Sequence, residues 1–202
     1  MSAREEILGR VRSALAAVEP DPVPVVAPRA AAADDLVDLF AERVADYRAT
    51  VVHCAPDGVG VAVAAALPAG GRVVVPAGLP EEYVAGLAVH ADDDLSAADL
   101  DRVDAVVTAC RVAIAETGTI VLDHASEQGR RAITLVPDRH VCIVRADQVV
   151  ADVPDAIAVL DPVRPLTWIS GPSATSDIEL DRVEGVHGPR VLHVVVVSDT
   201  GV

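Results

Sequence analysis

Three short polar clusters in the second half of this chain gather most of the side chains that could do chemistry, and apolar runs flank them. The clusters cover residues 115–119, 171–179 and 185–189. They contain carboxylates, hydroxyls and a histidine, which proteins use for acid–base work, nucleophilic attack and anion binding. Because open α/β sheets bind ligands at strand ends, we expect function at these clusters.

The first cluster reads Ala-Glu-Thr-Gly-Thr. Its Glu116 is the candidate catalytic residue, an acid, base or nucleophile at a strand end beside two hydroxyls. The candidate ligand-binding residues next to it are Thr117, Gly118 and Thr119. The alternative is structural, since Thr117-Gly118 would also form a tight hairpin turn in which glycine supplies a positive φ.

The second cluster offers five candidate ligand-binding residues: Gly171, Ser173, Thr175, Asp177 and Glu179. A strand followed by a Gly-Pro turn and a hydroxyl-rich helix N-terminus favours an anion site, because helix amides donate hydrogen bonds there. Asp177 and Glu179 oppose an anion unless they coordinate a metal or accept hydrogen bonds from the ligand. The alternative is a capping box of Ser176 and Glu179 that simply starts a helix.

The third cluster adds His187 and Gly188 as candidate ligand-binding residues in a loop. A lone loop histidine is usually exposed or bonded to backbone, which is the structural alternative. His140 and Cys142 would share one face of a strand, as metal ligands sometimes do, but no further pair stands at suitable spacing. No metal site is therefore predicted.

Charge narrows the classes of function. The formal net charge of −15 disfavours nucleic acid and anionic membranes as partners, because both repel such a surface. All 16 basic residues are Arg, so a Schiff-base lysine and a P-loop lysine are excluded. Arg130, Arg131, Arg139 and Arg145 form a basic island, which indicates either a solvated face or a contact with an anion or acidic partner.

The cysteines and the apolar runs limit which cofactors and which cell compartment can be expected. The three cysteines are far apart and no Cys-x-x-Cys occurs, so we expect buried reduced thiols and no iron–sulfur cluster. No Gly-x-Gly-x-x-Gly follows a candidate strand, and no cofactor is predicted. No apolar run reaches the roughly 18 residues of a membrane span, and the N-terminus lacks a signal-peptide core. A cytoplasmic protein without a membrane span is expected.

The elements expected from the pattern divide the chain at residue 33. Residues 1–33 comprise a helix, whose Ser2 and Glu5 have capping-box spacing, and a Pro-rich linker that frees this helix to reach a partner. Residues 34–202 predict an α/β domain with an aliphatic core, since 51% of the chain is hydrophobic and only 2% aromatic. The expected helices are 34–48, 58–67, 96–102, 153–160 and 177–183.

The expected strands fall into two groups. Runs at 50–54, 72–75, 87–90, 105–109 and 191–197 are apolar throughout, which indicates burial on both faces of a parallel sheet. Runs at 113–116, 119–123, 133–137 and 141–145 leave no room for helices between them and require hairpins or tight loops. With a further strand at 166–170, a three-layer fold with a mixed, mostly parallel sheet follows.

Four motifs in order, at residues 115–119, 134–140, 171–179 and 186–189, resemble the LUD-domain family, specifically its lactate utilization protein C branch. The resemblance spans about residues 50–197, and the first helix is similar to that family's leader. It implies a fold like that of the glucosamine-6-phosphate isomerase, ribose-5-phosphate isomerase and coenzyme A transferase group. It also implies a role in oxidising L-lactate to pyruvate beside iron–sulfur lactate utilization proteins. The family supplies no agreed catalytic residues.

Two functions compete on this basis. The first is a cluster-free subunit or accessory factor of a lactate-oxidising system, which is not a redox catalyst alone. The alternative is a stand-alone enzyme or ligand-binding protein that uses a strand-end pocket for a small carboxylate, sugar-phosphate or folate-like ligand. ATP-dependent folate cyclo-ligases would be expected to use lysines that this sequence lacks. In either case the expected ligand is a small anion.

Overall fold

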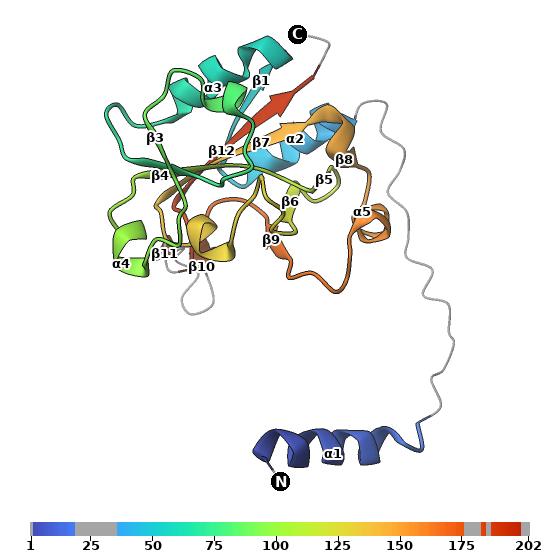
Figure 1. Ribbon diagram of the computed structural model, residues 1–202. Coiled ribbons are helices and arrows are strands. Elements are labelled where there is room, and N and C mark those ends of the chain that lie inside the picture. The colour runs from blue at the N-terminus through green and yellow to red at the C-terminus, as the bar shows by residue number, and fades with distance from the viewer. Residues whose placement is uncertain (1, 19–35, 176–182, 185–186, 199–202) are drawn as a thin grey trace.

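The computed structural model of the protein describes residues 2–18, 36–175, 183–184 and 187–198. Its centre is a six-stranded sheet in which all neighbouring strands are parallel (Figure 1). In spatial order the strands are β1 (Thr50–Cys54), β12 (Val191–Val197), β7 (Arg139–Arg145), β4 (Ala105–Ala109), β2 (Val73–Val75) and β3 (Val89–Ala91). Every residue of β2 and β4 is buried, as their continuous apolar sequences predict.

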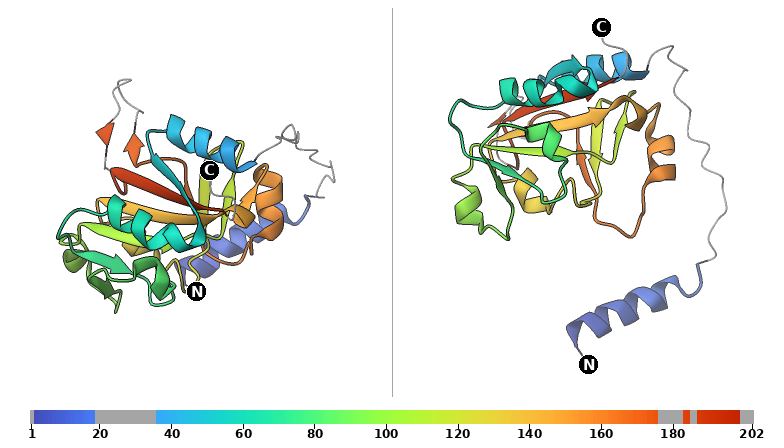
Figure 2. Two further views of the ribbon diagram at one scale, coloured as in Figure 1. Left: turned by 90° about the horizontal axis from the view of Figure 1, so that it is seen from above. Right: turned by 45° about the horizontal axis from the view of Figure 1, so that its top comes forward.

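A second sheet contains both antiparallel and parallel pairs. Its strands in spatial order are β8 (Val149–Val150), β5 (Val112–Ile114), β6 (Thr119–Leu122) and β9 (Thr167–Ile169). Together with helix α2 (Leu36–Asp46) it packs on one face of the central sheet. Helix α3 (Val59–Ala66) and the 3-10 helix η2 (Glu81–Val84) cover the other face (Figure 2).

Successive side chains of the second sheet point to opposite faces, and its outer face packs on a further helix. Ala113 and Ile120 face the central sheet, whereas Ile114 and Val121 pack on helix α5 (Val153–Val159) around Ala156. The remaining elements are short: η1 (Pro56–Gly58), α4 (Ala97–Leu100), η3 (Arg131–Thr134), η4 (Ala146–Gln148) and the antiparallel pair β10 (Ala174–Thr175) and β11 (Val183–Glu184). The protein is therefore a layered α/β fold with an aliphatic core.

The structure confirms the mostly parallel α/β fold and places the antiparallel pairs outside the central sheet. The strands predicted at 50–54, 105–109 and 191–197 begin and end where expected. The strand predicted at 133–137 is wrong: η3 lies there, and the amides of Leu135 and Val136 bond the Ala132 carbonyl instead of a neighbouring strand. Of the helix predicted at 177–183, residues 177–182 lie outside the described residues and Val183 belongs to β11.

Helix α2 ends against two turns that require glycine. Gly118 has φ 58° in the turn between β5 and β6, which confirms the predicted hairpin, and Gly171 has φ 86° after β9. A Cβ on Gly118 would lie 2.7 Å from the backbone carbon of Arg43, and one on Gly171 would lie 2.6 Å from Cβ of Tyr47. The last turn of α2 therefore rests directly on both turns.

The N-terminal helix α1 (Ala3–Leu15) has the predicted capping box, with Ser2 N donating to Glu5 Oε2 at 2.7 Å and Glu5 N donating to Ser2 Oγ at 3.3 Å. None of its residues is buried, and its apolar stripe of Ile7, Val11 and Leu15 is exposed by 60%, 48% and 58%. Figure 1 shows α1 apart from the α/β body. No helix in the described ranges is long and apolar enough to cross a membrane.

Deletion of residues 1–19 should leave the stability of the α/β body unchanged. No side chain of α1 is buried, so removing the helix should alter the free energy of unfolding by less than about 0.5 kcal/mol. Urea denaturation followed by circular dichroism of both chains measures this difference. A loss of more than about 1 kcal/mol would mean that α1 packs on the body in solution.

Gly118→Ala should destabilise the protein far more than Gly70→Ala. Both positions have positive φ, at 58° and 70°, so both pay about 1–2 kcal/mol for a left-handed alanine. At Gly118 the added Cβ also clashes with α2, which costs a further ~1–3 kcal/mol. At Gly70 nothing lies within 4 Å of the added Cβ, so that variant has no such clash. Thermal and urea denaturation of the two variants provide the comparison, and equal losses would contradict the close approach of α2.

Candidate functional site

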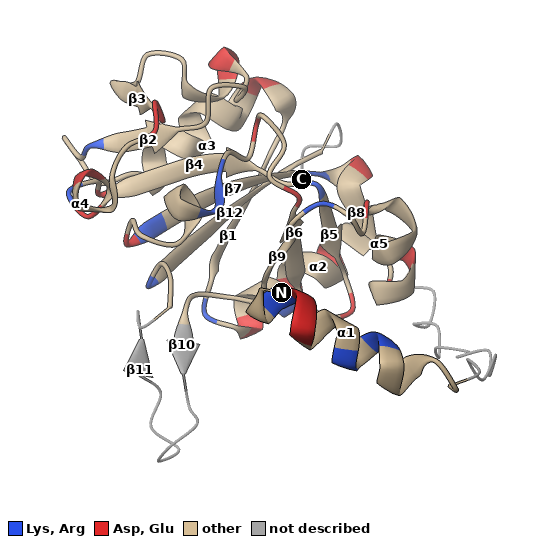
Figure 3. Cartoon of the chain, turned by 60° about the horizontal axis from the view of Figure 1, so that its bottom comes forward, with Lys and Arg blue, Asp and Glu red and all other residues tan. Residues whose placement is uncertain are grey.

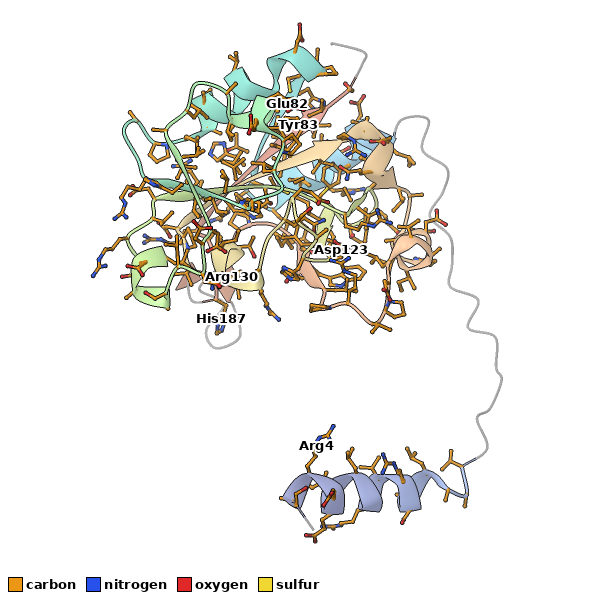
Figure 4. The ribbon with its side chains drawn as sticks, in the orientation of Figure 1. Arg4, Glu82, Tyr83, Asp123, Arg130 and His187 are labelled. Atoms are coloured by element: carbon orange, nitrogen blue, oxygen red, sulfur yellow. The ribbon has the colours of Figure 1, made fainter. Side chains whose placement is uncertain are left out.

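A cavity of about 310 Å³ opens at the amino ends of β7 and β12, the edge of the central sheet where the second and third polar clusters meet. The 3-10 helix η3, the first residues of both strands, the end of β9 and two loops surround it. The lining residues are Arg131, Thr134, Leu135, His140, Thr167, Trp168, Ile169, Ser170, Gly171, Pro172, Ser173, His187, Gly188, Pro189 and Leu192. Figure 4 labels His187 at this end of the body.

No carboxylate lines this cavity among the residues that the structure describes, although the chain carries 31 Asp and Glu against 16 basic residues. Figure 3 shows acidic segments on α1, α4 and α5 instead. The ionisable side chains that line the cavity are Arg131, His140 and His187, which are neutral or positive. The local charge therefore favours an anion in an otherwise acidic protein.

Arg131 is the cation of this cavity, and its guanidinium makes no hydrogen bond or ion pair with a described residue. The other members of the predicted basic island are engaged elsewhere. Arg130 donates to both carboxylate oxygens of Asp92 at 2.7 and 2.8 Å, and the pKa of Arg130 is raised by that hydrogen-bonded carboxylate. Arg139 and Arg145 stand at opposite ends of β7, so the four arginines do not form one patch.

Hydrogen bonds join the two loops beside the cavity. Ser173 N donates to the Pro189 carbonyl at 2.8 Å, and His187 N donates to Ser173 Oγ at 3.2 Å. At the edge, Arg190 donates to both oxygens of Asp138 at 2.6 Å, and these bonds lower the pKa of the Asp138 carboxyl. The second and third predicted clusters therefore meet through Ser173, His187 and the segments that lead into β7 and β12.

The first cluster reaches this cavity only indirectly. Glu116 and Thr117 line a separate hollow with Arg43, Asp46 and Tyr47. The hydroxyl of Thr117 donates to Thr119 Oγ1 at 2.8 Å, and Thr119 Oγ1 lies 2.8 Å from Ser170 Oγ on the side of the cavity. A line of hydroxyls thus connects the two hollows, while Glu116 stays outside the cavity. Its role as an acid, base or nucleophile stays a prediction.

The remaining candidates take different places. Gly171 and Gly188 line the cavity, and Gly118 supports α2. Thr175 belongs to β10, which pairs with β11. Asp177 and Glu179, with the proposed capping box at Ser176, lie outside the described residues.

His140 forms the floor of the cavity and was weighed from the sequence only as a metal ligand. It is 1% exposed, and its Nε2 lies 2.8 Å from Oγ1 of the fully buried Thr108. The register of β4 and β7 places Thr108 directly opposite Cys142, on the face that His140 shares. Among the described residues, no group of three metal-ligating side chains is present.

The buried thiols of Cys110 and Cys142 interact, and this interaction raises the pKa of Cys110 and lowers that of Cys142. Cys110 Sγ donates to Gln148 Oε1 at 3.6 Å, and Cys142 Sγ lies 3.9 Å from the Ala109 carbonyl. Cys110 and Cys142 are buried free thiols, as predicted, whereas Cys54 is only half-buried. Burial raises the pKa of the Cys54 thiol.

A loop from residue 123 to residue 130 braces the cavity from the second sheet. The fully buried Gln128 accepts hydrogen bonds from the amides of Asp123 and His124 at 2.7 and 3.1 Å. His124 in turn lies 2.9 Å from the Gly129 carbonyl and 2.9 Å from Thr167 Oγ1, a lining hydroxyl. The side of the cavity is therefore held by buried polar contacts and is preorganised.

The opposite edge of the sheet carries a second hollow, of about 500 Å³, where the carboxyl ends of β1, β7 and β12 meet. Figure 4 labels Glu82 and Tyr83 at this end, away from His187. Parallel sheets usually bind ligands at this edge. Here, however, its cation Arg145 is already paired with Asp147 at 2.9 Å, and Glu82 adds negative charge. The charge of its lining therefore favours an anion less than that of the cavity at the amino edge.

Comparison with known proteins identifies relatives of this chain, one of them over almost its full length. The LUD domain family matches residues 24–197. A lactate utilization protein C from Deinococcus radiodurans is 50% identical over 205 residues, covering 97% of this chain and 96% of that protein. One from Bacillus subtilis is 33% identical over 104 residues, covering 46% of this chain and 42% of that protein.

A solved structure of a related protein has a similar fold. The crystal structure of a DUF162 family protein from Deinococcus radiodurans has a TM-score of 0.69 and 44% sequence identity, covering 81% of this chain and 96% of that chain. The LUD match and the near full-length relative agree with the resemblance carried by the four motifs. The chain therefore belongs to the LUD domain family.

Proposed function

We propose that this protein serves in the utilization of L-lactate, as a subunit or accessory factor of a system that oxidises L-lactate to pyruvate. The observation that carries the proposal is the 50% identity to a lactate utilization protein C over nearly the full length of both chains. An alignment of that length includes the central sheet and the cavity as well as the leader. A relative that shared only the fold would not support the role in this way.

The proposal places the redox centre in a partner protein. Oxidation of a 2-hydroxy acid releases two electrons, and proteins use cofactors to accept them. This sequence has three widely spaced cysteines and no Cys-x-x-Cys, whereas a cluster is usually held by four cysteine thiolates. Iron–sulfur lactate utilization proteins are the proposed partners.

Helix α1 is the proposed contact with such a partner. Its stripe of Ile7, Val11 and Leu15 repeats at helical spacing and is exposed, which suits a helix that binds in an apolar groove. The α/β body does not bury this stripe. Deletion of the helix is therefore expected to weaken assembly while the body stays folded.

The cavity at the amino edge is the proposed site for a small anion. Arg131 supplies a cation without a described partner, Ser170 and Ser173 supply hydroxyls, and no described carboxylate opposes the ligand. A volume of about 310 Å³ is at the lower end for ligand pockets, which supports a small ligand. The same features support the second candidate function, a stand-alone protein that binds a small carboxylate or sugar-phosphate.

A strain that lacks the gene should fail to grow on L-lactate as sole carbon source, and the intact gene should restore growth. The pure protein should not reduce a dye with L-lactate, because the electrons need the partner's redox centre. Growth on pyruvate is the control, since it bypasses the oxidation step. Normal growth of the deletion strain on L-lactate, with no second copy of the gene, would refute the pathway role.

Replacing Arg131 with Gln should weaken the binding of small anions by about tenfold to a hundredfold, the usual value of a hydrogen bond to a charged group. Isothermal titration with pyruvate, L-lactate and inorganic phosphate measures this change. Arg102→Gln is the matched control, because Arg102 is exposed near α4 and lies outside the cavity. Equal binding by the two variants would remove Arg131 from the site.

A further inference from the structure

We infer that His140 recognises the oxygen on C2 of a 2-oxo or 2-hydroxy carboxylate whose carboxylate group is bound by Arg131. The inference rests on the proposed anion site and adds to it the part of the ligand that distinguishes these acids from simple carboxylates. It makes His140 a specificity-determining residue of the cavity.

The position of His140 is the first argument. It is the second residue of β7, its neighbours in register are Val106 and Leu192, and it is almost completely buried. An imidazole at such a place costs free energy unless its nitrogens are bonded, and a leucine would fill the space without that cost. The ring nevertheless lines the cavity that holds Arg131.

The hydrogen bonds of the ring are the second argument. Nε2 lies 2.8 Å from Thr108 Oγ1, which also contacts the Cys142 thiol, and the ring interacts with that thiol as well. None of the hydrogen bonds among the described residues is made by Nδ1. No described side-chain nitrogen or oxygen is both fully buried and without a partner, so Nδ1 keeps access to the cavity. One nitrogen is therefore used to fix the ring, and the other is left for a ligand.

Thr108 also sets which nitrogen carries the proton. Its hydroxyl has one proton to donate, and the acceptors near it are His140 Nε2 at 2.8 Å and Cys142 Sγ at 4.0 Å. We assign that proton to the 2.8 Å contact with Nε2, and in this tautomer the proton of the imidazole ring is on Nδ1. The cavity thus receives an N–H donor at its floor.

This donor matches one chemical class of ligand. An anion bound at Arg131 places its carboxylate on the cation, and an oxygen on the adjacent carbon can then accept from Nδ1–H. A carbonyl or a hydroxyl oxygen satisfies the donor, whereas a methylene group leaves it unpaired. A site that is built to bond an oxygen rejects the analogue that lacks it, because its buried polar group loses its partner.

The test compares pyruvate, L-lactate and propionate by isothermal titration against the full-length protein. Propionate has the carboxylate and nearly the same size but no oxygen on C2. The wild type should bind pyruvate and L-lactate at least about tenfold more tightly than propionate, the value of one buried hydrogen bond. In His140→Phe this preference should vanish while the affinity for propionate stays within about twofold.

Two further variants separate the roles. Arg131→Gln should weaken all three acids by the same factor and keep the preference. Thr108→Val should reduce the preference, because the ring loses the contact that fixes it, and long-range ¹H–¹⁵N spectra should then show a change in the protonation of Nδ1. Circular dichroism melts check that each variant is folded, and Thr108→Val provides the test if His140→Phe does not fold.

Several outcomes would overturn the inference. These are equal binding of the three acids by the wild type, a preference that survives in folded His140→Phe, or one that is unchanged in Thr108→Val. If none of the acids binds, the anion site itself is refuted. The growth experiment is independent of all these results, so a failure here is distinguishable from a failure of the lactate role.

Discussion

The structure depends above all on the pairing of β12 between β1 and β7. The strand Val191–Val197 pairs in parallel with β1 on one side and with β7 on the other. It contributes Val194 and Val196 to the core on one face and Val195 to the core on the other. Without it, β1 would have no neighbour in the central sheet, and the elements on both faces would lose part of the surface on which they pack.

The same pairing creates the candidate site. Because β7 and β12 run parallel and in register, His140 and Leu192 lie side by side at the bottom of the cavity. The segments that lead into these strands bring Arg131 on one side and His187 on the other. The cavity therefore lies at the amino edge, although parallel sheets more often use the carboxyl edge. The distribution of charge explains this choice, since the carboxyl edge already carries a neutralised arginine beside acidic residues.

The sequence was sufficient for features that depend on local patterns. Continuous β-branched runs predicted β1, β4 and β12, and Thr117-Gly118 predicted a hairpin, because each pattern has one favourable backbone arrangement. The apolar run at 133–137 failed because a helical turn buries Ile133 and Thr134 without a neighbouring strand and leaves Val136 exposed. Apolar content alone does not distinguish these outcomes.

The site shows the same limit more clearly. Ser173 and His187 could be predicted as site residues because each lies in a short polar cluster between apolar runs, a pattern that a single stretch of sequence contains. Arg131 was seen only as part of a basic island, and His140 only as a possible metal ligand. The role proposed for them depends on contacts such as Thr108–His140, which join residues 32 positions apart. That contact exists only after β4 and β7 pair, so no local pattern contains it.

The position of β12 also has a consequence for synthesis of the chain. A ribosome releases β1 long before it makes residues 191–197, so the first strand of the sheet must wait for almost the last segment. Until then, the facing edges of β1 and β7 are unpaired, and α2 and α3 lack the part of their packing surface that β12 supplies, a condition that favours aggregation. A nascent chain that has not yet made β12 therefore has unpaired strand edges and exposed apolar surface, to which chaperones can bind.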